Sequence, residues 1–332
     1  MNVYIVGAGA IGTYLGELLA GIGNTVTYAP RSLDDVVPVT AELAIVAVKA
    51  YDTERAIETL RRAIRPDAGT VIVCPQNGIG NEEKLAAAFG ADAIVACALT
   101  VPVGRDRDGK GTATHDGGIA FAPVGDSDAH NWLLATFGAT GMVVKALDDY
   151  RALKWSKLAL NVVANASCAI LNVLPDRLVH FGDVFEMEIR AIREVRAVMA
   201  ALKLRPIDLP RYPLRALQGI ATLPNPVARA ILGNRVAGAR GRKPPSLLQD
   251  LRAGRSNTEV EFLNGAVAEA GQRTGVRTPV NAVYARVLSD ITYMPQLWAK
   301  YRERPEALDA EIRAEISRMQ PNAGLRRSRR FS

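Results

Sequence analysis

The 332-residue sequence has few cysteines and no long apolar run, and each shortage excludes a class of protein. Its three cysteines, Cys74, Cys97 and Cys168, lie far apart in apolar surroundings, which matches neither a disulfide framework nor a metal site. We therefore expect buried free thiols, a cytoplasmic location and no bound metal. No apolar run approaches the roughly 20 residues that span a bilayer, and the amino terminus lacks the basic region and cleavage site of a signal peptide. We expect no membrane partner.

Positive charge gathers at the carboxyl end of the chain. The formal net charge is +7, and the last twelve residues contain Arg326, Arg327, Arg329 and Arg330. We expect residues 321–332 to form a basic, disordered tail. No nucleic-acid recognition motif accompanies this tail, so we expect no nucleic-acid partner. The positive field instead suits an anionic cofactor or substrate.

The first part of the chain alternates between strand and helix patterns. Its near-continuous apolar strands are typical of a parallel sheet that is buried on both faces. This alternation predicts a Rossmann-type, doubly wound α/β domain over residues 1–146. The expected strands are 2–6, 25–29, 43–49 and 70–75, and the expected helices include 53–64, 82–89 and 130–137.

The second part of the chain is mostly helical. Long helices are predicted at 148–171, 183–202 and 256–275. Asp148 and Asp149 suit the positive N-terminal end of the first, and Gly275 is placed to end the third. We expect residues 147–320 to form a mostly α-helical domain for substrate binding and catalysis.

The segment GAGAIG directly follows the first predicted strand and opens a helix. In a β-α-β unit, Gly7 permits a tight turn, Gly9 lets the backbone approach a pyrophosphate, and Gly12 lets helix and strand pack closely. Free N–H groups at the helix N-terminus favour the anion. A glycine-rich turn without a ligand is the alternative. We expect a dinucleotide to contact Gly7, Ala8, Gly9, Ala10, Ile11 and Gly12.

The end of the second strand indicates which dinucleotide binds. An NAD site usually carries an acidic residue roughly 20 residues beyond the glycines, where it binds the ribose 2′-hydroxyl. This chain offers Arg31 there, and a guanidinium can pair with a 2′-phosphate. We therefore favour NADP(H). Asp34 and Asp35 lie nearby and keep the NAD alternative open, as does a solvated Arg31 without a ligand.

Two further strand ends point to the same edge of the sheet. Lys49 ends the third strand and Asn77 follows the fourth. Ligands of open α/β sheets bind beyond the carboxyl ends of the strands. Lys49 could meet a phosphate or carboxylate, and Asn77 a ribose, a carboxamide or a substrate oxygen. Asn77 and Gly78 could also form a turn and nothing more.

The helix predicted at 148–171 carries an unusual polar row. Lys157, Asn161 and Asn165 recur every fourth residue on a helix that is otherwise largely apolar. Such residues share one face and form a stripe roughly 12 Å long. Facing a nicotinamide, Lys157 could act as a general acid and the two asparagines could hold substrate oxygens. A polar seam between helices would explain the row equally well.

Two residues near later helix starts complete the candidate set. Ser246 supplies a hydroxyl and Glu259 a carboxylate, but both are also ordinary helix-capping residues. Their neighbouring sequence, together with the polar row, carries a resemblance that spans residues 1 to about 290. The matching segments are GAGAIG, VAVKAYDT (46–53), QNGIGNEEKL (76–85), THDGGIAF (114–121), KWSKLALNVVANASCAILN (154–172) and SLLQDLRAGRSNTEVEFLNG (246–265).

In these segments the sequence resembles the ketopantoate reductase (2-dehydropantoate 2-reductase) family. The resemblance implies NADPH-dependent reduction of 2-dehydropantoate to (R)-pantoate, on the route to pantothenate and coenzyme A, and two domains that close over the substrate. It implies that Lys157 is the acid. The resemblance further implies that Asn161, Asn165 and Ser246 bind substrate. Lys49, Asn77 and Glu259 would line the cofactor or the substrate junction, with Glu259 counted among the catalytic groups.

The resemblance has departures, and they bear on the substrate more than on the reaction. The segment between Arg31 and Leu43 is short, RSNTE is one residue longer than the family spacing, and Pro175 and Asp176 stand where many relatives place an asparagine. A related reductase acting on another keto acid or an imine is therefore an alternative. A non-catalytic NADP(H)-sensing protein is a further one. The apolar faces of the helical half are compatible with a homodimer.

Overall fold

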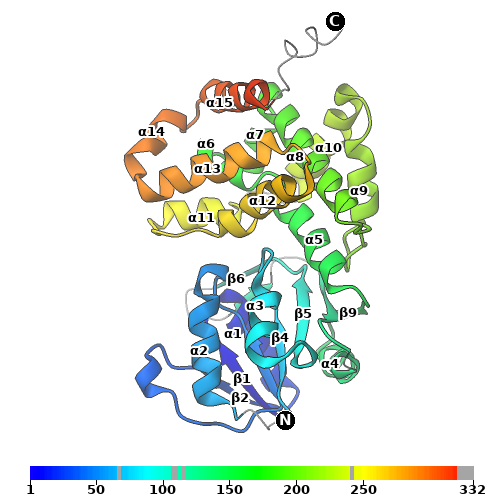
Figure 1. Cartoon of the computed structure of the whole chain (residues 1–332), viewed down its shortest axis with the longest axis vertical. Helices are drawn as coiled ribbons and strands as arrows, with labels where there is room; N and C mark the ends of the chain where they lie inside the picture. The colour runs from blue at the N-terminus through cyan, green and yellow to red at the C-terminus, as the bar shows by residue number, and fades with distance from the viewer. Residues whose placement is uncertain (66–68, 106–110, 114–116, 127, 240–242, 320–332) are drawn as a thin grey trace, which may run out of the picture. The chain divides into compact units, whose positions relative to one another are not determined.

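A computed structural model describes residues 1–65, 69–105, 111–113, 117–126, 128–239 and 243–319 (Figure 1). The chain divides into two compact units. We call Met1–Asn161 with Met199–Gly219 the sheet unit, and Val162–Val198 with the residues from Ile220 onward the helical unit. The basic tail expected at 321–332 lies outside the described residues.

In the described part of the sheet unit, seven strands form one sheet in the order β2-β1-β3-β4-β5-β8-β9. Strands β1 to β5 are parallel, β8 is antiparallel to β5, and β9 is parallel to β8. The predicted doubly wound α/β fold is confirmed. The strands are β1 Asn2–Val6, β2 Thr25–Tyr28, β3 Leu43–Val46, β4 Val71–Cys74, β5 Ile94–Leu99, β8 Gly118–Pro123 and β9 Val143–Ala146.

Helices cover both faces of this sheet because alternate strand residues point to opposite sides. Val3 and Ile5 of β1 face the core beneath α1 (Ala10–Gly21) and α4 (Ala129–Gly138), whereas Tyr4 and Val6 face α2 (Thr53–Ala63) and α3 (Asn81–Phe89). The short elements that precede α5 are η1 Leu33–Asp35, η2 Ala50–Asp52, η3 Ala91–Ala93, and the paired strands β6 Val103–Arg105 and β7 Gly111–Ala113.

Helix α5 (Tyr150–Asn161) packs on the sheet because the strands beneath it carry small side chains. Its Leu153 lies against an alanine patch on β5 and β8, formed by Ala96, Ala98, Ala120 and Ala122. Asp149 caps the helix as predicted, since its carboxylate accepts from the Ala152 N–H at 2.9 Å. The sheet unit therefore extends to Asn161, beyond the boundary at 146/147 that the change of sequence character suggested.

The chain beyond α5 is helical. Glu194 ties two helices together in its core, because its buried carboxylate accepts from the backbone N–H groups of Val280 and Asn281 at 3.0 Å each. The elements are α6 Ala166–Leu171, α7 Pro175–Leu178, α8 Gly182–Ala201, α9 Leu214–Ala221, α10 Asn225–Ala239, α11 Ser246–Arg252, η4 Glu259–Phe262, α12 Asn264–Thr274, α13 Pro279–Tyr293, η5 Pro295–Leu297, α14 Trp298–Tyr301 and α15 Pro305–Arg318.

Two of the predicted long helices are interrupted. The helix expected at 148–171 ends at Asn161 and resumes at Ala166, and Ala164 between them has a positive φ of 50°. The helix expected at 256–275 begins only at Asn264, after the separate turn η4. Gly275 ends it in the left-handed conformation, as predicted.

Candidate active site

The first glycine turn has the stereochemistry that the sequence predicted. Gly7 has a φ of +109°, and a Cβ there would lie 2.7 Å from the backbone of Ala47 and Val48. A Cβ on Gly12 would lie 1.9 Å from the Gly7 carbonyl oxygen. Only glycine fits at these two positions because the obstructing atoms are backbone. The turn therefore brings the N-terminus of α1 against the ends of β1 and β3.

Gly9 differs from the other two glycines because its surroundings are open. It is exposed, and the nearest protein atom to a Cβ there is the Ala47 carbonyl oxygen at 4.0 Å. It is also the N-cap of α1, so no side chain caps the first turn, which contains no acidic residue. This is an open helix N-terminus that fits the pyrophosphate of a dinucleotide. The cofactor contacts of Ala8, Ala10 and Ile11 stay predictions.

The segment after β2 is held by arginines of α2. The Arg55 guanidinium donates to the carbonyl oxygen of Arg31, and Arg62 donates to the carbonyl oxygen of Leu33 at 3.0 Å. Arg62 also lies 3.7 Å from the carboxylate of Asp34. Arg31 itself is exposed. Arg31 and Arg55 thus provide two guanidinium groups at the end of β2. The nearby acid Asp34 is paired with Arg62.

A buried polar network joins the ends of β3 and β4. Gln76 follows β4 and donates from its amide to the Val48 carbonyl oxygen at 3.1 Å and to the Thr53 hydroxyl at 2.9 Å. Thr53 donates in turn to the side chain of Asn81, and Asn81 donates to the Asn77 carbonyl oxygen at 3.0 Å. These bonds fix the loop in which Asn77 stands. Lys49, half-buried, lies just before this network as the N-cap of η2.

Helix α5 contacts this loop along one face. The amide of Asn161 donates to the side-chain oxygen of Asn77 at 2.9 Å. Two turns earlier, the Lys154 ammonium donates to the Gln76 carbonyl oxygen at 2.5 Å. Lys157, half-buried, lies between these two residues on the same face, because positions three and four apart share a face. The predicted acid and the predicted asparagine are therefore both at the carboxyl edge of the sheet.

Lys154 is the main residue that the sequence analysis missed. Its ammonium lies 2.7 Å from the carboxylate of Glu82 in the first turn of α3, and the two side chains are 4% and 1% exposed. Burial by itself lowers the pKa of Lys154, but the Glu82 carboxylate, together with Cys74 and Cys97, outweighs it and the net pKa is raised. The available signal was a lysine on an apolar helix, since a buried ammonium needs a partner.

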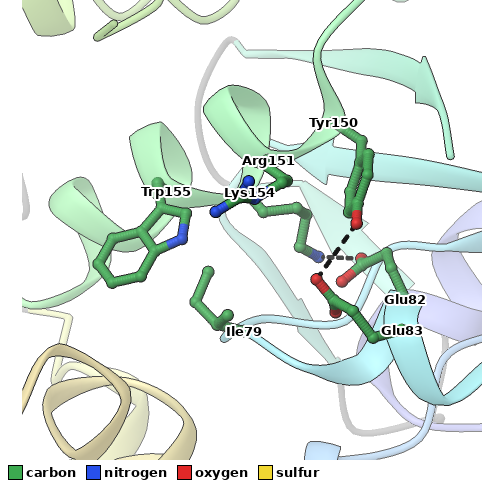
Figure 2. Close-up of a pocket in the computed structure, with 7 residues that line it drawn as sticks. All are labelled: Ile79, Glu82, Glu83, Tyr150, Arg151, Lys154 and Trp155. Carbon is green, nitrogen blue, oxygen red and sulfur yellow. Dashed lines mark hydrogen bonds and ion pairs between the residues drawn. The ribbon is translucent and has the colours of Figure 1, made fainter. Parts of the chain in front are cut away.

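A small hollow lies beside this pair. Figure 2 shows its lining, formed by Ile79, Glu82, Glu83, Tyr150, Arg151, Lys154 and Trp155. The Tyr150 hydroxyl donates to Glu83 at 3.4 Å. Burial first, and the Glu83 carboxylate second, raise the pKa of Tyr150 to about 12, so this hydroxyl is protonated at neutral pH.

The polar row predicted on one helix is divided between the two units. Lys157 and Asn161 belong to the sheet unit, whereas Asn165 follows the interruption and belongs to the helical unit. The prediction of a single continuous stripe is therefore wrong. The helix is interrupted between α5 and α6, where the buried carboxylate of Glu188 accepts from the Ala164 N–H at 2.6 Å and stabilises the turn.

In the helical unit, Asn165 lies against the start of α11. Its amide donates to the Ser246 hydroxyl at 3.3 Å, and its oxygen accepts from the Leu247 N–H at 3.1 Å. The structure thus brings together Asn165 and Ser246, to which the family resemblance assigns substrate binding. Glu259 begins η4 and is 4% exposed. It has at least one interaction partner in the folded chain.

The three cysteines are free and buried, as predicted. Burial raises the pKa of the Cys97 thiol to about 12 and that of Cys74 well above its ordinary value, so neither is a thiolate nucleophile at neutral pH. Among the described residues, no cluster of three or more His, Cys, Asp or Glu could hold a metal ion. The helices in the described ranges include none long and apolar enough to cross a membrane.

Comparison with known proteins decides the family. Residues 28–126 match the family described as Ketopantoate reductase PanE/ApbA, and residues 149–292 match its C-terminal part. A protein of Pyrobaculum aerophilum named 2-dehydropantoate 2-reductase is 30% identical over 237 residues, covering 71% of this chain and 72% of that protein. This chain belongs to the ketopantoate reductase family.

Longer alignments to ketopantoate reductase relatives agree. Proteins named 2-dehydropantoate 2-reductase are 27% identical over 308 residues in Archaeoglobus fulgidus and 28% identical over 330 residues in Halobacterium salinarum. The first alignment covers 84% of this chain and 94% of its relative, and the second covers 89% and 99%. The ketopantoate reductase family is thus matched along most of the chain.

Solved structures share the fold. A PanE/ApbA family ketopantoate reductase of Ralstonia eutropha is 24% identical with a TM-score of 0.73, covering 89% of this chain and 100% of that one. D-mandelate dehydrogenase in complex with NADH is 21% identical with a TM-score of 0.71, covering 88% and 99%. The ketopantoate reductase fold therefore extends to a protein with another name, and the fold alone does not identify a substrate.

Proposed function

We propose that this protein reduces 2-dehydropantoate to (R)-pantoate with NADPH. Family membership supports the reaction. The observation that carries the proposal for the site is the 2.9 Å hydrogen bond from Asn161 to Asn77. It joins the helix bearing Lys157 to the loop after β4, at the edge of the sheet where parallel α/β folds bind their ligands.

The proposed chemistry needs a proton donor at the substrate carbonyl. NADPH, when bound, supplies the hydride to the carbonyl carbon. The Lys157 ammonium donates its proton to the carbonyl oxygen as negative charge develops there. Asn161 and Asn77 hold substrate or ribose oxygens. In the helical unit, Asn165 and Ser246 bind substrate polar groups, and Glu259 supplies a carboxylate for a substrate hydroxyl.

The NADPH preference rests on charge at the end of β2. Arg31 is exposed there, and Arg55 reaches its carbonyl oxygen, so two guanidinium groups are available for a 2′-phosphate. The nearest acid, Asp34, is paired with Arg62. Lys49, just beyond β3, is proposed as a further contact for a cofactor phosphate.

The test is a panel of 2-keto acids assayed with NADPH and with NADH. We expect the loss of reduced-nicotinamide absorbance to be fastest with 2-dehydropantoate and NADPH. A better arylglyoxylate or other 2-keto acid would move the assignment to a related reductase. Binding of NADPH without oxidation by any member of the panel would favour a sensing role and contradict the enzyme.

Two further expectations concern the oligomeric state and the cellular location of the protein. A solved relative of 16% identity from Staphylococcus aureus is described as a dimeric ketopantoate reductase. We propose a homodimer for this chain, which light scattering after size exclusion tests directly. The cytoplasmic location stays a prediction, and fractionation of the producing cells tests it.

A further inference from the structure

Two contacts attach helix α5 to the loop that follows β4. Lys154 binds the Gln76 carbonyl oxygen at 2.5 Å, and Asn161 binds the Asn77 side chain at 2.9 Å. The loop residues are adjacent in sequence, whereas the helix residues are seven positions apart, which is roughly 10 Å along the helix axis. Lys157 lies between the two contacts on the same face. Its position over the loop is therefore determined by both.

The loop is also anchored by hydrogen bonds to residues outside α5. Gln76 is anchored through its side chain to Val48 and Thr53, and the Asn77 backbone is anchored to Asn81. The positions of Gln76 and Asn77 relative to the sheet are thus fixed by bonds that do not involve α5. These bonds do not determine the distance between α5 and the loop. The Lys154 ammonium does so through a buried contact to the loop, one turn before Lys157.

Glu82 makes this contact possible. A buried ammonium without a counter-charge is costly, and the Glu82 carboxylate lies 2.7 Å away in the first turn of α3 (Figure 2). A buried ion pair is a weak stabiliser compared with apolar residues of the same size. Stability alone therefore gives little reason for a charged pair at this position. The fixed contact between the Lys154 ammonium and the Gln76 carbonyl oxygen gives a better one.

We propose that Lys154, neutralised by Glu82, is a positioning residue that sets the reach of Lys157 over the Asn77 loop. The proposal rests on the function proposed above, in which Lys157 is the proton donor. Displacement of the donor by about 1 Å can lower turnover by 10²-fold. The effect should fall on kcat and leave NADPH binding largely unchanged, because Lys154 binds the loop backbone and lies outside the predicted cofactor contacts.

The first variant is Lys154→Met, which removes the ammonium and leaves Glu82 buried without its partner. We expect kcat to fall roughly 10- to 100-fold, while the NADPH dissociation constant changes by less than about threefold. We also expect the variant to lose stability, since one partner of a buried pair has been removed. Loss of stability could lower the yield of folded enzyme, so this variant needs a companion.

The companion is Lys154→Met combined with Glu82→Leu, which removes both charges. Its midpoint of thermal unfolding should recover toward that of the wild type, because no unpaired charge remains. Its kcat should stay low, because the contact to Gln76 is still absent. If the pair were merely structural, kcat would recover together with stability, and that result would overturn the proposal.

Lys145→Met is the matched control. Its ammonium also donates to a backbone carbonyl, that of Asp208 at 2.6 Å, in the same unit but on β9. We expect its kcat to stay within about twofold of the wild type. A fall as large as that of Lys154→Met would show that any lost lysine–carbonyl contact in this unit has the same effect, and would also overturn the proposal.

A crystal structure of the double variant separates this inference from the proposed function. An inactive wild type would contradict the function, but the structure can still be read. We expect the Asn161–Asn77 contact to lengthen beyond hydrogen-bond distance as α5 moves. A contact retained at its wild-type distance would show that Lys154 does not position the helix, whatever the enzyme does.

Discussion

Gly9 and Gly12 lie three residues apart at the start of α1, and alanine at each should separate folding from cofactor binding. At Gly12 the new Cβ would lie 1.9 Å from the Gly7 carbonyl oxygen, and ordinary contact begins at 3.4 Å. Helix α1 would therefore have to move by about 1.5 Å. Overpacking of this kind lowers the free energy of unfolding by roughly 1–3 kcal/mol. The higher helix propensity of alanine offsets about 1 kcal/mol of this loss.

At Gly9 the same methyl meets no protein atom nearer than 4.0 Å. We expect the free energy of unfolding of Gly9→Ala to stay within about 0.5 kcal/mol of the wild type. A dinucleotide running over the turn would nevertheless meet the methyl group. We therefore expect at least about tenfold weaker NADPH binding, which corresponds to about 1.4 kcal/mol.

Gly21→Ala is the control on the same helix, since a Cβ there has no atom within 4 Å. It should bind NADPH normally and gain up to about 1 kcal/mol in stability. Urea unfolding gives the stabilities, and isothermal titration calorimetry gives the affinities. Wild-type NADPH affinity in a folded Gly9→Ala variant would refute the reasoning, because the pyrophosphate could not then lie over this turn.

Two further predictions concern charge. Arg31→Asp should shift the ratio of kcat/KM for NADPH over NADH toward NADH, since it replaces a 2′-phosphate partner with a hydroxyl partner; an unchanged ratio would show that the 2′-phosphate is bound elsewhere. Burial raises the pKa of Glu194 from 4.5 in the unfolded chain to about 7, despite its hydrogen bonds to Asn281 and Val280. Protonated Glu194 therefore makes its full contribution to the free energy of unfolding below pH 4.5. This contribution falls by roughly 3 kcal/mol as the pH rises to about 7. Glu194→Gln should remove that part of the decline in unfolding free energy between these pH values, and parallel pH profiles for the two proteins would contradict the assignment.

Local stereochemistry made the glycine turn predictable. The positive φ at Gly7 and the close packing at Gly12 follow from the spacing of three glycines between a strand and a helix, although the backbone that excludes a Cβ at Gly7 belongs to the distant Ala47 and Val48. The cap at Asp149 and the stop at Gly275 were predictable for the same reason. Each depends on groups that lie within a few residues of one another.

The interruption after α5 could not be predicted locally. Its residues are compatible with a helix, and the turn depends on Glu188, which lies 24 residues away along the chain. The buried partners of Lys154 are likewise distant, on α3 and in the loop after β4. Periodicity placed Lys157 and Asn161 on one face correctly because both lie before the interruption, and placed Asn165 wrongly because it lies after it.

The role of Lys157 is tested most directly by single-turnover oxidation of bound NADPH. Wild type and Lys157→Ala, each saturated with NADPH, are mixed with saturating 2-dehydropantoate, and the reduced-nicotinamide absorbance is followed. We expect the variant to bind NADPH with similar affinity and to oxidise it about 10²-fold more slowly, or slower still. Oxidation by Lys157→Ala at close to the wild-type rate would contradict the account, because the proton would then come from another group.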